Sequence, residues 1–237
     1  MEILKDTEII DLALYLKKEK ILVISDTHIG YEEALNKQGV FVPRISFKEV
    51  VLKLEKILSK TGKLDRIIVN GDIKHEFGKI SETEWRHTLR LLDFLSNHCK
   101  EVILVKGNHD TILGPIANKR KVKVTNYVKV NDILLIHGDV LVKKELLKSV
   151  KTIIIGHEHP AVTIRDAARA EKYKCFLKGR YLRRNLIVMP SFNLLVYGLD
   201  VTSVKKFSPF LKQKLDNFEV YVIGDKVYNF GKLKKLS

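Results

Sequence analysis

Residues 101–110 read EVILVKGNHD, an apolar run that leads through Gly107 into Asn108, His109 and Asp110. Four other short apolar runs have the character of a buried strand and also end in polar turns. Those turns are Asp26-Thr27-His28, Gly71-Asp72, His137-Gly138-Asp139 and Gly156-His157-Glu158-His159. Any one of them is compatible with an ordinary turn or cap. Their recurrence, always after a strand, indicates one shared site.

Helices and further strands are expected around these runs. Ser46 and Ser81 each begin an S-x-x-E capping box, with apolar residues behind it at helical spacing. A hairpin is expected over 11–25, and strands over 185–189, 194–201 and 219–230. Strands that alternate with helices predict an α/β fold, in which ligands bind at the carboxyl ends of the strands. We therefore expect the five polar turns to meet.

The composition indicates one large domain over residues 1–237, because 45% hydrophobic residues suffice for one substantial core. No run of eighteen apolar residues is present, so no membrane span is expected. The first ten residues lack the apolar stretch of a secretory signal, which favours a cytoplasmic protein. Cys99 and Cys175 are far apart and are interpreted as ordinary thiols.

The chain is strongly basic. Its 43 Lys and Arg exceed its 28 Asp and Glu, which gives a net charge of +15. Such an excess favours polyanionic partners, nucleic acid among them. A lysine-rich thermophile surface explains it equally well, since 30% of residues are charged and glutamine occurs only at Gln38 and Gln213. Charge alone does not choose between the two.

The polar turns supply seven candidate metal ligands. They are Asp26, His28, Asp72, Asn108, His137, His157 and His159. Oxygen and imidazole donors suit manganese, iron, zinc or nickel better than magnesium or calcium. Seven donors are too many for one catalytic ion with an open position, and they suit two ions that share a carboxylate. The neighbouring glycines at 71, 107, 138 and 156 allow tight turns close to the site.

The series D-x-H, G-D, G-N-H-D, H-G and G-H-x-H, in this order from Asp26 to His159, resembles the calcineurin-like metallophosphoesterases. The resemblance implies a four-layer αββα sandwich, in which two mixed sheets pack face to face and helices flank them. It also implies two divalent ions, with manganese expected first and iron, zinc or nickel as alternatives. One ion would be held by Asp26, His28, Asp72 and His159. The other would be held by Asp72, Asn108, His137 and His157, with Asp72 bridging.

The same resemblance implies that metal-activated hydroxide attacks phosphorus without a covalent enzyme intermediate. It assigns His109 the role of proton donor or charge stabiliser. Asp110 is a candidate for orienting His109, and a structural cap is the alternative.

Two further features bear on the substrate. His75 stands three residues after Asp72, as in the G-D-x-x-H of SbcD-type nucleases of DNA repair, where that histidine helps to place the phosphate; a solvent-facing histidine is the alternative. Residues 26–44, DTHIGYEEALNKQGVFVPR, resemble an archaeal phosphoesterase group related to the ligase-associated phosphoesterases of bacterial DNA repair. Within them, Arg44 is either a phosphate clamp or a surface residue at a helix start.

The segment 165–184 carries eight Lys or Arg and two Asp or Glu, with aromatic residues interleaved. Cations and stackable rings suit single-stranded nucleic acid, whereas a solvated loop whose rings pack on the body is the alternative. The candidate contacts are Arg165, Arg169, Tyr173, Arg180 and Tyr181.

The sequence thus favours a two-metal phosphodiesterase that acts as a nuclease on DNA or RNA, with a role in repair. The alternative is an enzyme for small substrates, such as cyclic nucleotides or nucleotide phosphoesters. A scaffold that has lost activity is the third interpretation, and the complete ligand set argues against it. A homodimer would supply further binding surface.

Overall fold

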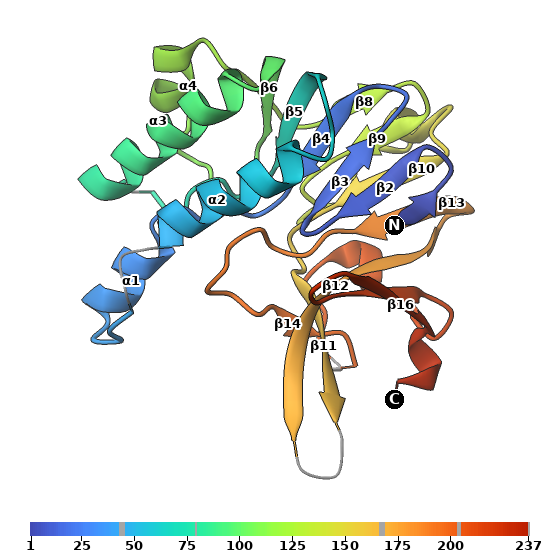
Figure 1. The fold of residues 1–237 in the computed structure, drawn as a ribbon. Helices are drawn as coiled ribbons and strands as arrows, with labels where there is room; N and C mark the ends of the chain where they lie inside the picture. Colours follow the sequence, from blue (N-terminus) through green and yellow to red (C-terminus); the bar gives the residue numbers. More distant parts are fainter. Residues whose placement is uncertain (43–45, 79, 166–168, 203–204, 237) are drawn as a thin grey trace.

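The computed structural model describes residues 1–237 except 43–45, 79, 166–168, 203–204 and 237 (Figure 1). Its first sheet has seven strands among these residues. In spatial order they are β1 (Glu2–Leu4), β2 (Thr7–Ile10), β3 (Ala13–Leu16), β4 (Ile21–Ile24), β5 (Leu64–Asn70), β6 (Cys99–Val105) and β7 (Lys123–Thr125). Strands β1 to β4 pair antiparallel, which confirms the hairpin expected over 11–25. Strands β4 to β7 are parallel.

The second sheet is also mixed. Its spatial order is β14 (Leu199–Asp200), β11 (Pro160–Arg165), β12 (Ala170–Tyr181), β13 (Arg184–Val188), β10 (Thr152–Ile155), β9 (Ile133–Leu135) and β8 (Val128–Val130). Strand β15 (Glu219–Ile223) pairs with β12 and with β16 (Val227–Lys232), so the predicted C-terminal hairpin is confirmed. Strand β10 runs parallel to both β9 and β13.

The two sheets pack face to face because their strands are apolar on both sides. From the first sheet, Val23, Ile68 and Ile103 contribute to the core between the sheets. Ile154, Phe176 and Ile187 meet them from the second sheet. The alternate residues of β4, Leu22 and Ile24, face the helices instead. A two-sided apolar pattern of this kind is typical of strands buried in a sandwich.

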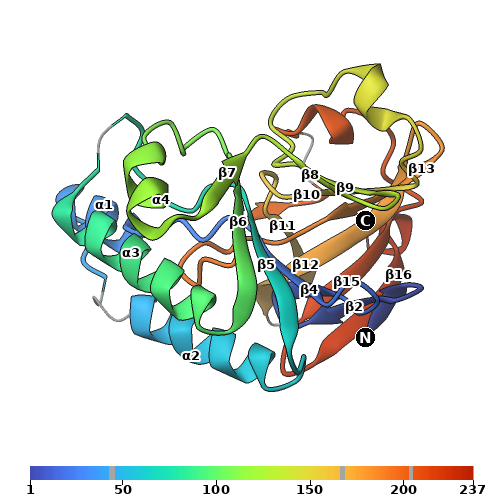
Figure 2. The same cartoon turned by 90° about the horizontal axis from the view of Figure 1, so that it is seen from above.

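Helices flank the sandwich, as predicted (Figure 2). They are α1 (Tyr31–Lys37), α2 (Ser46–Leu58), α3 (Glu82–Ser96) and α4 (Gly114–Arg120). Leu54 of α2, Leu92 of α3 and Ile116 of α4 are fully buried on the outer side of the first sheet. The outer side of the second sheet is covered by short 3-10 turns, η1 (Lys144–Leu147) and η2 (Pro209–Leu211), and a third, η3 (Leu233–Lys235), follows β16.

The capping box at Ser81 is confirmed, since its side chain accepts a hydrogen bond from the Glu84 amide and Glu84 bonds back to the Ser81 amide. The side chain of Ser46 lies outside the described part, although α2 does begin there. Among the described residues no helix is long and apolar enough to cross a membrane. Both cysteines are free thiols.

Two expectations about the C-terminal half were wrong. The strand predicted over 194–201 exists only as Leu199–Asp200, because the chain turns at Asn193, whose side-chain oxygen accepts from the Leu195 amide, and at Gly198. The loop alternative for 165–184 also fails, because Ala170–Tyr181 form the long strand β12.

Parallel pairing brings the polar turns together. Ile24, Val69 and Leu104 stand side by side in β4, β5 and β6, so the turns that carry Asp26, Asp72 and Asn108 leave the same edge of the first sheet. In the second sheet Leu135 pairs with Ile154, and the turns after β9 and β10 follow. The amide side chain of Asn70 donates to the Ile136 carbonyl across the sheets and joins the two edges.

Candidate metal centre

Asp26, His28 and His159 form the first group of candidate ligands, with ligand atoms within 4.8 Å of one another. The Nε2 atoms of His28 and His159 are 3.3 Å apart. Oδ1 of Asp26 lies 3.5 Å from Nε2 of His159. This group contains three of the four ligands expected for one ion.

Asp72, His137 and His157 form the second group. Nε2 of His137 lies 3.1 Å from Nδ1 of His157 and 2.9 Å from Oδ1 of Asn108. Asp72 lies between the groups, because its Oδ2 is 3.4 Å from Nε2 of His137 and 3.8 Å from Nε2 of His28. All seven predicted donors therefore meet at one edge of the sandwich.

The donor geometry fits divalent ions. Two nitrogens bound to one ion at about 2.0–2.1 Å stand roughly 2.9–3.4 Å apart, depending on the coordination angle. The two facing imidazole pairs, at 3.1 and 3.3 Å, lie in that range. Asp26 directs Oδ2 to the Ser25 hydroxyl and the His157 amide. Its buried Oδ1 accepts no hydrogen bond from the described residues and is free to bind an ion.

The backbone approaches the site closely. A Cβ atom on Gly71 would lie 1.9 Å from Nδ1 of His137, and one on Gly107 would lie 2.0 Å from Oδ1 of Asp72. Five candidate ligands adopt positive φ, a conformation that non-glycine residues seldom take. They are Asp26, His28, Asp72, His157 and His159. Strain of this kind concentrates at functional sites.

The site's electrostatics favour added positive charge. Burial disfavours charged His137, but the Asp72 and Asp26 carboxylates outweigh burial and raise its pKa to about 9. Burial would raise the pKa of Asp26, yet His159 and His137 hold it below its usual range. Burial, followed by His159, lowers the pKa of His28 to about 3, which keeps the imidazole in its neutral, ligating form.

His109 lies on the rim of this centre. Its Nδ1 is 2.5 Å from the His75 carbonyl oxygen, so Nδ1 carries the proton and Nε2 faces the site, 3.9 Å from Oδ2 of Asp72. The Phe77 ring packs on the imidazole with centroids 3.7 Å apart. His75 is half-buried rather than solvent-facing, with its ring 5.5 Å from that of His28. Burial, followed by His109, lowers the pKa of His75 to about 4.

Asp110 bonds to the backbone rather than to the ring of His109. Its carboxylate accepts from the amides of Gly107 and Ile73, at 3.0 and 3.2 Å, and so ties together the turns after β5 and β6. Burial, followed by repulsion from Asp72, raises its pKa to about 7.

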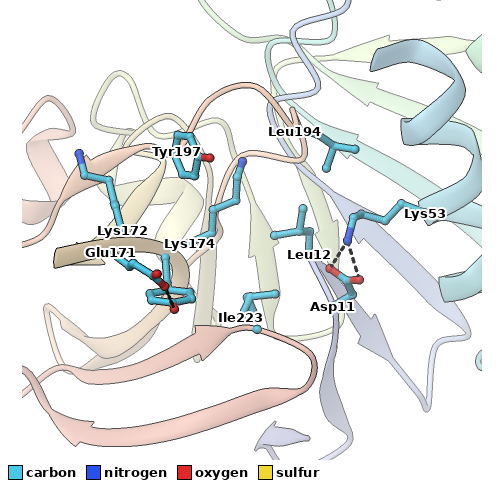
Figure 3. A pocket seen from close by; sticks show the side chains of 11 residues that line it. Asp11, Leu12, Lys53, Glu171, Lys172, Lys174, Leu194, Tyr197 and Ile223 are labelled. Carbon is cyan, nitrogen blue, oxygen red and sulfur yellow. Dashed lines mark hydrogen bonds and ion pairs between the residues drawn. The ribbon is translucent and has the colours of Figure 1, made fainter. Parts of the chain in front are cut away.

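Two supporting residues carried no recognisable sequence signal. The Ser191 hydroxyl donates to the Asp26 carbonyl, and the Asn193 amide donates to the carbonyls of Thr27 and His28. Lys174 reaches the same segment from β12, with Nζ 2.7 Å from the Ser191 carbonyl (Figure 3). No motif announces these contacts, because they join positions about 165 residues apart.

Glu158, to which the sequence assigned no role, is buried and points away from the ions' positions. Its Oε2 accepts from the amides of Phe207 and Ser208, at 2.9 and 2.7 Å. Phe207 lines the pocket of about 360 Å³ over the metal centre. Glu158 therefore joins the ligand turn to one wall of this pocket.

The predicted nucleic-acid contacts are dispersed. Arg165 and Arg169 are exposed near the tip of the β11–β12 hairpin, which projects from the body (Figure 1). Tyr173 lies nearer the body, where Val162 of β11 pairs with it. Arg180 and Tyr181 lie at the other end of β12, where the Tyr181 ring packs on Phe210. Arg44 lies outside the described residues.

Comparison with known proteins gives the class. The model of the calcineurin-like phosphoesterase family matches residues 19–198, so the chain belongs to this family. It is a metal-dependent phosphoesterase, and the αββα fold and the family resemblance seen in the sequence are confirmed.

Solved structures share the fold. The nuclease MPE of Pseudomonas putida is 18% identical, with a TM-score of 0.65 over 93% of this chain and 92% of its own. Vacuolar protein sorting 29 of Cryptosporidium parvum is 16% identical, with a TM-score of 0.39 over 90% and 97%. An uncharacterised Streptococcus pneumoniae protein, described as a phosphoesterase, is 13% identical, with a TM-score of 0.34 over 90% and 97%. No curated protein sequence matches the chain.

Proposed function

We propose that the chain is a two-metal phosphodiesterase that cleaves DNA or RNA. The observation that carries the proposal is the pair of ligand groups with Asp72 between them, beneath an open pocket. Two divalent ions, manganese first among the candidates, would supply a hydroxide nucleophile and offset charge on the phosphoryl oxygens. The identity of the seven ligands is part of the proposal.

His109 would act on the leaving group. The His75 carbonyl holds the proton on Nδ1, and protonation of Nε2 then gives a donor that faces the pocket. The imidazole can pass that proton to the leaving oxygen or stabilise its charge. Phe77, packed on the ring, limits its rotation.

Two observations favour nucleic acid over a small ester. The chain carries a net charge of +15, which attracts a polyanion. The fold is also shared, over most of both chains, with a protein described as a nuclease. Small esters, such as cyclic nucleotides, are the alternative substrate class.

The test compares substrates after the metal-free protein has been loaded with Mn²⁺. We expect turnover of bis-p-nitrophenyl phosphate and of labelled DNA, and none without metal. Turnover of small esters or 2′,3′-cyclic nucleotides with intact single- and double-stranded DNA and RNA would contradict the nuclease proposal. No turnover of any of them would favour a scaffold.

A further inference from the structure

A second hollow, of about 770 Å³, lies behind the segment 194–199 (Figure 3). This segment is a wall between two pockets. Val196, Gly198 and Leu199 line the metal-centre pocket, whereas Leu194 and Tyr197 line the second hollow. The Leu199 amide donates to the His159 carbonyl at 2.8 Å, so the wall is fixed to a candidate ligand. The hollow is therefore next to the reaction site but separate from it.

The hollow is apolar at its base and carries rings at its edge. Leu12, Leu194 and Ile223 contribute the apolar surface. Tyr197 is 65% exposed, and Tyr173 of β12 also lines the space. Hollows of this size bind drug-sized ligands, which have apolar bodies and a few polar contacts. Flat rings stack on such tyrosines, and nucleobases do so irrespective of sequence.

Three lysines surround this apolar base. Lys172 extends Nζ to 3.5 Å from the Gly198 carbonyl, and Lys174 bonds to the wall at Ser191. Lys53 of α2 stands on the opposite side, paired with Asp11 at 2.8 Å (Figure 3). The other acid, Glu171, accepts a hydrogen bond from the Tyr173 hydroxyl. Both acids are thus engaged, and the cations exceed them by one.

We propose that this hollow binds a nucleotide unit of single-stranded nucleic acid, next to the phosphodiester held at the metal centre. The inference rests on the proposed function and extends it from a reaction to a strand path. A base would stack on Tyr197 above the apolar surface, and a neighbouring phosphate would meet Lys172. Duplex DNA keeps its bases stacked inside and cannot place one there without unpairing.

The test compares Tyr197→Ala, Tyr197→Phe and Lys172→Ala with the unaltered protein. Two quantities are measured: binding of a fluorescent single-stranded oligonucleotide to the metal-free protein, and the ratio of oligonucleotide to bis-p-nitrophenyl phosphate turnover with Mn²⁺. Lys151→Ala is the matched control, because Lys151 is an exposed, ion-paired lysine at the opposite end of β10 from the ligand turn.

We expect Tyr197→Ala to weaken oligonucleotide binding by about fivefold or more and to lower the turnover ratio similarly, as loss of one stacked base does. Tyr197→Phe keeps the ring and both values. Lys172→Ala should reduce the salt slope of binding by about 0.7, the value for one phosphate contact on a single strand. Lys151→Ala should change neither quantity.

Unchanged binding and ratio in both Tyr197→Ala and Lys172→Ala would overturn the inference. Tighter binding of mononucleotides than of the oligonucleotide would also overturn it, in favour of a free nucleotide as the occupant. An unaltered protein that binds the strand through Tyr197 but cleaves only the small diester would contradict the proposed nuclease function and leave the strand site standing.

Discussion

His109 tests the chemistry at the scale of one residue. Its fixed tautomer and its place on the rim fit proton transfer to the leaving group rather than metal binding. His109→Ala should lower kcat on a phosphodiester by about 10²–10⁴-fold, the usual contribution of a general acid. Bound metal, measured by elemental analysis, should not change. A variant with full turnover and full metal content would contradict this role.

Gly107 tests how closely the backbone must approach. Gly107→Ala places a Cβ atom 2.0 Å from Oδ1 of Asp72, so the carboxylate has to move. We expect an affinity for Mn²⁺ lower by about tenfold or more, comparable to loss of a residue that orients a ligand. Isothermal titration calorimetry measures it.

The matched control for this change is Gly114→Ala, at the start of α4, where a Cβ atom meets nothing within 4 Å. It should leave metal affinity unchanged and slightly raise the free energy of unfolding. Equal metal affinity in the two variants would show that close approach at Gly107 is unimportant.

At the scale of elements, strand β12 and the segment after β13 support the metal centre. Burial lowers the pKa of Lys174 to about 7 from an ordinary 10.5. Between these values the unfolded chain binds a proton that the folded chain does not, so this lysine makes stability rise with pH from about 7 to 10.5. Below pH 7 both states are protonated and the slope vanishes.

Lys174→Met should remove that contribution. Urea unfolding of both proteins at pH 6, 7, 8, 9 and 10 gives the difference in the free energy of unfolding at each pH. We expect the unaltered protein to gain on the variant as pH rises above 7. A difference that is constant over this range would contradict the burial of a neutral amine.

The elements also show where sequence reasoning succeeds. The ligand turns were predictable because each follows a strand with two-sided apolar character, and parallel strands end at one edge. The roles of Ser191, Asn193 and Lys174 were not, because a carbonyl contact leaves no pattern in the sequence. The strand at 170–181 was hidden by its lysines, which point into a hollow that only the packing of both sheets creates.

At the scale of the whole molecule, the net charge of +15 should act on polyanions alone. Each neutralised phosphate of a single strand contributes about 0.7 to the slope of log affinity against log salt. Raising KCl from 50 to 200 mM, within the range where screening matters, should therefore reduce oligonucleotide cleavage and leave bis-p-nitrophenyl phosphate turnover nearly unchanged. Equal inhibition of both would indicate a general effect of salt on the enzyme.

The number of ions per chain tests the central claim most directly. Asp72 lies between two ligand groups, and the chain has seven donors for them. Titration of the metal-free protein with Mn²⁺, followed by electron paramagnetic resonance, should give two ions per chain with the signal of a spin-coupled pair, and Asp72→Ala should lose the coupling. A single uncoupled ion in the unaltered protein, or a coupled pair that persists without Asp72, would contradict the two-metal account.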